Sequence, residues 1–182
     1  MPIANTRELF LHELSELYDA EYRFLEGQRE MVQNATDRDL RGAIENHIVQ
    51  TEQHIRNLEQ VFGELGQEPR RETNEVARGL VSEAREGIQE AQGEALRDCV
   101  IDAAVIKVEH FEMGSYRGLV TGAQLMGQTE VVSLLNVNMQ QEEDAARIAE
   151  QSAEELFQKA MQAEKQEEKG LIDKVKDRLT GQ

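Results

Sequence analysis

Five residues of types that commonly bind metal ions interrupt the apolar stripes of four long helix-forming segments. They are Glu21, His54, Glu109, Glu112 and Glu142. Carboxylates gathered inside a protein without a counter-charge would repel one another and be poorly solvated. One or two hard or borderline cations would neutralise such a cluster, with glutamate oxygens bridging and imidazole completing the coordination. The pattern therefore predicts a carboxylate-rich metal site in the interior.

The spacing of these residues repeats between the two halves of the chain. Glu21 and His54 are 33 positions apart, and so are Glu109 and Glu142. Each residue of the first pair also stands 88 positions before its counterpart in the second pair. If each half forms a helical hairpin with a short turn, these positions reach similar heights and converge on one volume. Glu112 follows Glu109 by three residues and therefore shares its helix face.

The other histidines have simpler interpretations. His47 shares a flank of its helical stripe with His54 but is expected to be structural, and His12 is expected to be exposed. His110 lies about 100° around the helix from Glu109, which favours a supporting or surface position over that of a ligand. Only His54 is therefore predicted to bind metal.

Two questions about the site stay open at the level of the sequence. Gln50 or Glu52, rather than His54, could supply the ligand of the second helical segment. Each acid could also lie at the edge of its stripe, with its stem packed and its carboxylate in water. Cys99 and Tyr116 are expected to pack in the core. For Tyr116, a hydrogen bond or one-electron transfer to a metal site is the second interpretation.

Apolar residues recur every three or four positions in four segments, which predicts four long helices. These segments cover about residues 5–33, 37–65, 94–126 and 129–168. Asn5 and Glu8 form a capping-box pattern at the first start, and Thr36 with Asp39 offers a second. Residues 66–93 carry a weaker apolar signal and several glycines, which predicts a shorter crossover helix.

Two helical pairs with short turns, joined by a long crossover, have the connectivity of a ferritin-like bundle. We therefore predict an all-α fold: a ferritin-like four-helix bundle with an additional crossover helix between the helix pairs. The bundle is expected to fill residues 1–168. Residues 169–182 are expected to form a short amphipathic tail that docks as a small helix or frays.

The net charge of the chain indicates which classes of partner it can bind. The 36 acidic residues outnumber the 20 basic ones and give a formal net charge of −16. An acidic surface disfavours the phosphates of nucleic acid and attracts divalent cations. No stretch approaches the roughly 18 consecutive apolar residues of a membrane span, and the single Cys99 fits a reducing compartment. We therefore expect a cytoplasmic protein without a nucleic-acid or membrane partner.

Three segments of the chain resemble the YciE/YciF-like stress proteins, a branch of the ferritin-like superfamily. They read TRELFLHELSELYDAEYRFL, HIVQTEQHIRNLEQVFGELG and DAAVIKVEHFEMGSYRGLV, and the resemblance covers about residues 6–157. It implies a ferritin-like bundle with a crossover helix, a homodimer and a dinuclear metal centre. Glu21 matches the family's first-helix carboxylate, Glu109 and Glu112 the paired third-helix carboxylates, and Glu142 the fourth-helix carboxylate. Wider ferritin-like relatives oxidise iron or reduce oxygen and peroxide at such centres.

The second and fourth helical segments depart from the ferritin-like pattern Glu-x-x-His. Thr51-x-x-His54 has the histidine without the glutamate, and Glu142-x-x-Ala145 has the glutamate without the histidine. This incomplete set weakens the case for ferroxidase chemistry but retains the case for binding. The leading hypothesis is a stress-response protein that binds one or two iron or manganese ions, with enzymatic redox activity left open. The alternatives are a metal-free, dimeric structural or interaction protein and a subunit of an iron-storing cage.

Overall fold

Helices make up nearly all of the part of the chain that the computed structural model describes. Residues 3–180 are described, except for the side chains of residues 177–180. The helices are α1 (Thr6–Asn34), α2 (Arg38–Glu64), α3 (Glu75–Glu90), α4 (Glu94–Leu125) and α5 (Thr129–Thr180). The predicted all-α bundle, with a crossover helix between two helix pairs, is therefore confirmed. None of these helices is long and apolar enough to cross a membrane.

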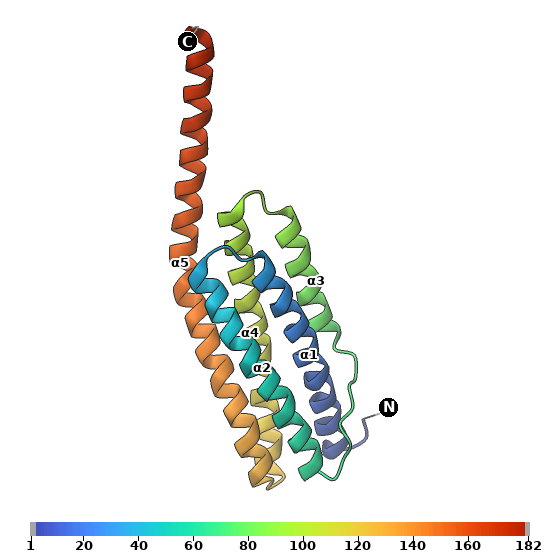
Figure 1. Cartoon of the computed structure of the whole chain (residues 1–182). Helices are drawn as coiled ribbons and strands as arrows, with labels where there is room; N and C mark the ends of the chain where they lie inside the picture. Colours follow the sequence, from blue (N-terminus) through green and yellow to red (C-terminus); the bar gives the residue numbers. More distant parts are fainter. Residues whose placement is uncertain (1–2, 181–182) are drawn as a thin grey trace.

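Four long helices form the bundle and α3 covers one side of it. α1 pairs with α2 and α4 pairs with α5, while α2 also packs on α5 and α1 on α4 (Figure 1). The crossover helix α3 lies against α1 and α4 (Figure 1). Each position on an inward helix face therefore lies opposite positions on three other helices.

The helix starts follow from side-chain caps. Asn5 caps α1 as predicted, because its side chain accepts a hydrogen bond from the Glu8 backbone N–H at 2.9 Å. At α2 the predicted pair of Thr36 and Asp39 is wrong, since the carboxylate of Asp37 accepts from the first backbone N–H groups instead. The Thr36 hydroxyl and backbone N–H donate to Asp98 on α4, which ties the α1–α2 turn to the other hairpin.

The apolar core is divided into two clusters along the bundle. One cluster fills the half where α1 begins and α2 ends, with Phe10, Leu58 and Leu135 among its members. The other fills the half where α1 ends, with Ile44 and Ile101 among its members. Burying large apolar side chains contributes roughly 1.5–3 kcal/mol each. A polar layer lies between the two clusters. The apolar burial on either side offsets the free-energy cost of burying this layer.

The predicted end of the last long helix near Glu168 is wrong. α5 continues through Gly170 to Thr180, and its C-terminal part, beyond the buried Ala160, projects from the bundle (Figure 1). One glycine costs a helix only about 1 kcal/mol relative to alanine, which does not force a break. Leu171, Ile172 and Val175 on this projection are 47–65% exposed. The division into a bundle of residues 1–168 and a tail of residues 169–182 stays a prediction, but no change of secondary structure marks it.

Candidate metal centre

The polar layer between the two apolar clusters contains metal-ligand residues from all four long helices. α1 contributes Glu21, α2 contributes histidines, α4 contributes Glu109 and Glu112, and α5 contributes Glu142. Each of these four glutamates is at most 1% exposed. The helix faces that carry them are the inward faces predicted from the apolar stripes, so the structure brings the predicted acids together.

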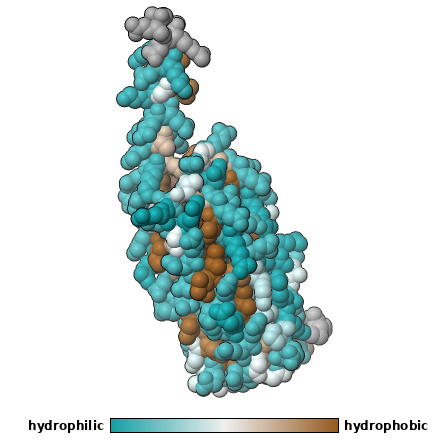
Figure 2. All heavy atoms as spheres, viewed as in Figure 1, coloured by the Kyte–Doolittle hydropathy of each residue, from teal (hydrophilic) through white to brown (hydrophobic). Residues whose placement is uncertain are grey.

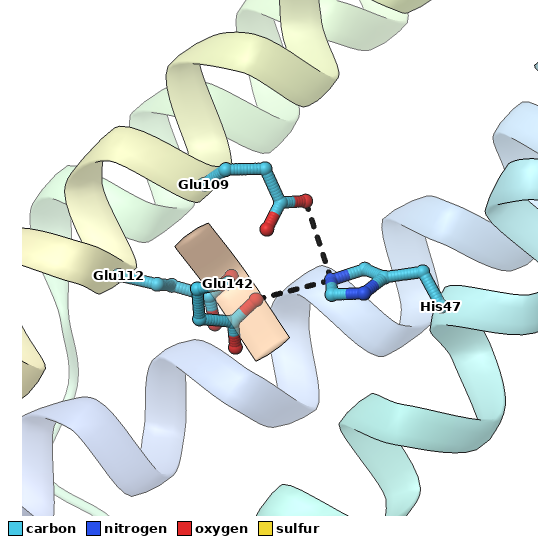
Figure 3. Close-up of side chains that lie close together, drawn as sticks. All are labelled: His47, Glu109, Glu112 and Glu142. Atoms are coloured by element: carbon cyan, nitrogen blue, oxygen red, sulfur yellow. Dashed lines mark ion pairs between the residues drawn. The ribbon is translucent and has the colours of Figure 1, made fainter. Parts of the chain in front are cut away.

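A first group joins α2, α4 and α5. The His47 Nε2 atom lies 3.2 Å from Glu109 Oε1 and 3.3 Å from Glu142 Oε2. Figure 3 shows the Glu112 carboxylate beside that of Glu142, pointing into the same space. One ligand atom of each of the four residues lies within 4.8 Å of the others. This geometry suits three carboxylates and one imidazole around a single ion.

A second group joins α1, α2 and α5. The His54 Nδ1 atom lies 2.8 Å from Glu142 Oε1 and 3.7 Å from Glu21 Oε1. Ligand atoms of these three residues also lie within 4.8 Å of one another. Glu142 belongs to both groups, with Oε2 facing His47 and Oε1 facing His54. A carboxylate placed in this way can bridge two ions.

The atoms that face one another across the cluster are not satisfied by hydrogen bonds. Among the described residues, seven buried ligand atoms of the six cluster residues have no hydrogen-bond partner. They are Glu21 Oε2, His47 Nε2, His54 Nδ1, Glu109 Oε2, Glu112 Oε1 and both carboxylate oxygens of Glu142. A buried polar atom without a partner costs about 1–3 kcal/mol. Besides the histidine–glutamate ion pairs, so many donor atoms at one place fit a metal site.

Two glutamine side chains fix which nitrogen of each histidine faces the cluster. The Nδ1 atom of His47 lies 3.0 Å from Gln50 Oε1, and the Nε2 atom of His54 lies 2.7 Å from Gln141 Oε1. An amide oxygen only accepts, so each of these nitrogens carries the proton and donates it. Once a metal replaces the second proton, each imidazole would be neutral and would turn a lone pair toward the site, as a metal ligand requires.

A buried hydrogen-bond chain holds the α1 carboxylate. The hydroxyl of Tyr116 donates to Glu21 Oε1 and accepts from the Asn138 amide at 2.9 Å. Asn57 on α2 donates to the amide oxygen of Asn138 at 2.6 Å. The predicted hydrogen bond of Tyr116 to the site is therefore present. This chain orients Glu21 from three other helices.

Burial and crowding distribute protons through the cluster in the absence of metal. Burial and neighbouring carboxylates raise the pKa of Glu112 well above its ordinary value. Burial raises the pKa of Glu109 to about 8, against the opposing effect of His47. Burial would lower the pKa of His54, but Glu21 and Glu142 outweigh it and raise that pKa to about 10. Protons therefore compensate the charge that a cation would otherwise compensate.

Glu142 has the opposite shift. Its burial would raise the pKa, but the two histidines outweigh burial and hold the pKa of this carboxyl well below its ordinary value. The residue shared by both groups is therefore the one that stays ionised, as a bridging ligand requires.

His47, which was expected to be structural, lies among the predicted acids. This side chain is 6% exposed and faces two of the predicted acids. The available signal was its spacing, because His47 precedes His54 by two helical turns and so shares its face. His12 and His110 lie outside the cluster, where His12 contacts Glu72 and the exposed His110 contacts Glu150.

The structure also places Cys99, Gln50 and Glu52, for which the sequence supported separate expectations. Cys99 is buried in the core cluster near the end of α1, as predicted. Gln50 supports His47 rather than facing the acids, and Glu52 pairs with Arg29 on the surface at 2.8 Å. His54 is therefore the better second-helix candidate of the three. The supporting residues Asn138 and Gln141 carried no signal in the sequence, because isolated polar residues on helices are mostly solvated.

A family model described as "Domain of unknown function (DUF892)" matches residues 5–172 of the chain. Protein YciF from Escherichia coli (strain K12) is 29% identical over 143 residues, which cover 78% of this chain and 86% of YciF. The crystal structure of that stress protein matches with a TM-score of 0.82 at 26% identity, and it covers 86% of this chain and 99% of YciF.

Two further solved structures have the same arrangement of helices. YcfI from Rhodopseudomonas palustris, whose description suggests a structural role, matches with a TM-score of 0.80 at 32% identity. That match covers 81% of this chain and 94% of YcfI. A protein from Xanthomonas campestris matches with a TM-score of 0.71 at 21% identity, over 88% of this chain and 99% of its own, which shows the shared fold alone.

Proposed function

This chain belongs to the DUF892 family, and we propose that it is a stress-response protein that binds iron or manganese inside its helical bundle. The observation that carries the proposal is the convergence of seven unpartnered buried ligand atoms from six residues of four helices. The similarity to the stress protein YciF supports the stress role. The acid-rich donor set supports a hard or borderline metal.

Charge balance favours two ions. Four carboxylates and two neutral imidazoles leave four negative charges, which two divalent cations would neutralise. The first ion would lie among His47, Glu109, Glu112 and Glu142. The second would lie beside Glu21 and His54, with Glu142 reaching both. The donor set differs from two Glu-x-x-His pairs because α2 supplies both imidazoles.

The residues around the cluster would set its chemistry. Bound iron or manganese supplies one-electron exchange with oxygen or peroxide, which zinc lacks. The two glutamines hold the imidazole tautomers, and the hydrogen-bond chain through Tyr116 holds Glu21. The apolar clusters lie on either side of the candidate ligands, each of which is at most 6% exposed. The proposal therefore extends to redox activity toward oxygen or peroxide, and an enzymatic role depends on turnover.

Metal uptake by purified, metal-free protein tests the binding proposal. Anaerobic equilibrium dialysis against Fe(II) or Mn(II) should give one to two ions per chain. The variant Glu109→Gln plus Glu112→Gln keeps side-chain size and should lose at least one of them. The matched control, Glu45→Gln plus Glu154→Gln, removes two exposed acids and should bind like the parent. Absence of uptake by the parent refutes the function, and equal uptake by the cluster variant refutes the site.

A metal-free structural or interaction protein is the second candidate. It is favoured by the description of YcfI and by the apolar residues exposed on the C-terminal half of α5, where Phe157 and Met161 are 59% and 54% exposed. The family resemblance supports a homodimer in the cytoplasm for either function. Light scattering separates a dimer from a monomer and from a storage cage. The structural candidate gains if the protein dimerises but takes up no metal.

A further inference from the structure

A groove of about 640 Å³ runs between α2 and α5, from the candidate metal centre toward the end of the bundle where α1 ends. Its α2 wall extends from Asp39 to Gln50, which is about 16 Å of helix at 1.5 Å per residue. Small-molecule sites commonly have volumes of about 300–1,000 Å³. The groove therefore has the size of a small-ligand site.

The walls of the groove are mainly apolar. Leu40, Ile44, Ile148 and Leu156 line it, and Ile148 remains 51% exposed. Alanines on both helices, including Ala43, leave the space open where larger side chains would fill it. Figure 2 shows the corresponding apolar surface along α2 and α5, bordered by hydrophilic residues. An exposed apolar patch of this kind usually marks a binding surface.

Buried polar groups lie on the floor of the groove. His47 and Glu109 line it, so one group of candidate metal ligands borders this space. Gln28 lines it as well and is 5% exposed. The Gln28 amide nitrogen donates to the Thr51 hydroxyl at 3.1 Å, but its Oε1 has no hydrogen-bond partner in the described part of the chain. The floor therefore contains a buried acceptor without a partner, at the residue that borders the groove.

The charged residues of the groove are mostly acidic. Asp37, Asp39, Asp102, Asp144 and Glu155 line it in addition to Glu109. The cation that lines it, Lys159, pairs with Asp37 at 2.7 Å and with Glu155 at 2.8 Å. A carboxylate or phosphate ligand would meet uncompensated negative charge here, whereas a neutral or cationic ligand would not.

We propose that this groove binds a neutral or cationic amphiphile, with its apolar chain along the walls and its hydrogen-bond donor at Gln28 beside the metal centre. A primary amine or alcohol on an alkyl chain has this chemistry. That the bound molecule is the substrate of the metal centre rests on the proposed function. Its binding in the groove does not, because Gln28 and the walls are independent of metal.

Calorimetric titration of the full-length chain with three octyl probes tests the proposal, with and without Mn(II). Octylamine and octan-1-ol should bind one per chain, and octanoate should bind at least tenfold more weakly. Shortening the chain to hexyl should weaken binding about fifteenfold, at about 0.8 kcal/mol per buried methylene. Because binding is measured without metal as well, failed metal uptake and failed groove binding give separate results.

Two variants locate the bound probe. Ala43→Phe places a ring in the groove and should weaken octylamine binding at least tenfold, while Ala103→Phe makes the same change on the exposed face of α4 and should not. The parent should bind octan-1-ol more tightly than octyl methyl ether, which cannot donate a hydrogen bond. Gln28→Leu should abolish this preference. Metal uptake should be unchanged in Ala43→Phe.

Several results would overturn the proposal. The groove is not a ligand site if no octyl probe binds, or if Ala43→Phe and the parent bind octylamine equally. Octanoate binding as tight as octylamine would refute the ligand class. If no probe binds and Ala43→Phe converts a dimer to a monomer in light scattering, a second copy of the chain covers the groove instead.

Discussion

Replacing Glu112 with glutamine should stabilise the metal-free protein and remove part of its response to metal. Glu112 is 1% exposed, and its Oε1 has no hydrogen-bond partner in the described part of the chain. Burial first, and then the charges of Glu142, Glu21 and Glu109, raise its pKa well above 4.5. No cation lowers this pKa, so burial and the three neighbouring acids all destabilise the ionised carboxylate.

The expected change in unfolding free energy, and its dependence on pH, follow from this environment. An acid whose pKa is higher in the folded state favours folding at low pH, and this contribution is lost as the pH rises from 4.5 through the folded-state value. Replacing crowded buried charges with neutral groups of similar volume commonly stabilises proteins by about 1–4 kcal/mol. Glu112→Gln should therefore gain about 1–4 kcal/mol at pH 7, with the gain shrinking below pH 4.5.

Urea unfolding followed by circular dichroism measures both parts of the prediction. With chelator, the variant should unfold at higher urea than the parent. With Mn(II) at one hundred times its dissociation constant the parent should gain about 2.7 kcal/mol, and the variant should gain much less. Glu45→Gln on the exposed face of α2 is the control and should change neither value. A metal-free variant less stable than the parent at pH 7, or an undiminished metal response, would refute the reasoning.

Three further predictions follow from the contacts described above. Mn(II) affinity should rise from pH 6 to pH 8, by about tenfold per pH unit for each proton displaced. The reason is that the pKa of His54, near 10, keeps its imidazole protonated without metal. Equilibrium dialysis at several pH values measures the affinity, and a flat profile would exclude His54 as a ligand. Tyr116→Phe should destabilise the protein by about 1–3 kcal/mol in urea unfolding, since it removes the buried hydrogen bonds to Glu21 and Asn138; an unchanged midpoint would mean that these groups find other partners. A Cβ added by Gly118→Ala meets no atom within 4 Å, so this variant should stabilise α4 by about 0.5–1 kcal/mol. Gly87→Ala instead brings a Cβ to 2.8 Å from Val100 and should destabilise the protein by about 1 kcal/mol or more. Equal thermal midpoints for the two variants would contradict the packing described between α3 and α4.

Local signals in the sequence determined the helices and the acids they bring together. The apolar stripes predicted four long helices and a crossover, and the 33-residue spacing predicted that Glu21 and Glu109 face their partners at one level. These signals are reliable because a helix has a fixed period and a short turn fixes the register of a hairpin. The same signals could not end α5, since the cost of Gly170 is too small to stop a helix.

Only the tertiary structure decided how the candidate ligands divide into two groups. His47 and His54 share a face of α2, and nothing in the sequence distinguishes a histidine that faces carboxylates from one that faces a groove. The positions of α4 and α5 relative to α2 place both imidazoles on opposite oxygens of Glu142. Likewise, the roles of Gln50 and Gln141 depend on contacts across helices. Helical periodicity gives the direction of a side chain, but the packing of the neighbouring helices decides what it meets.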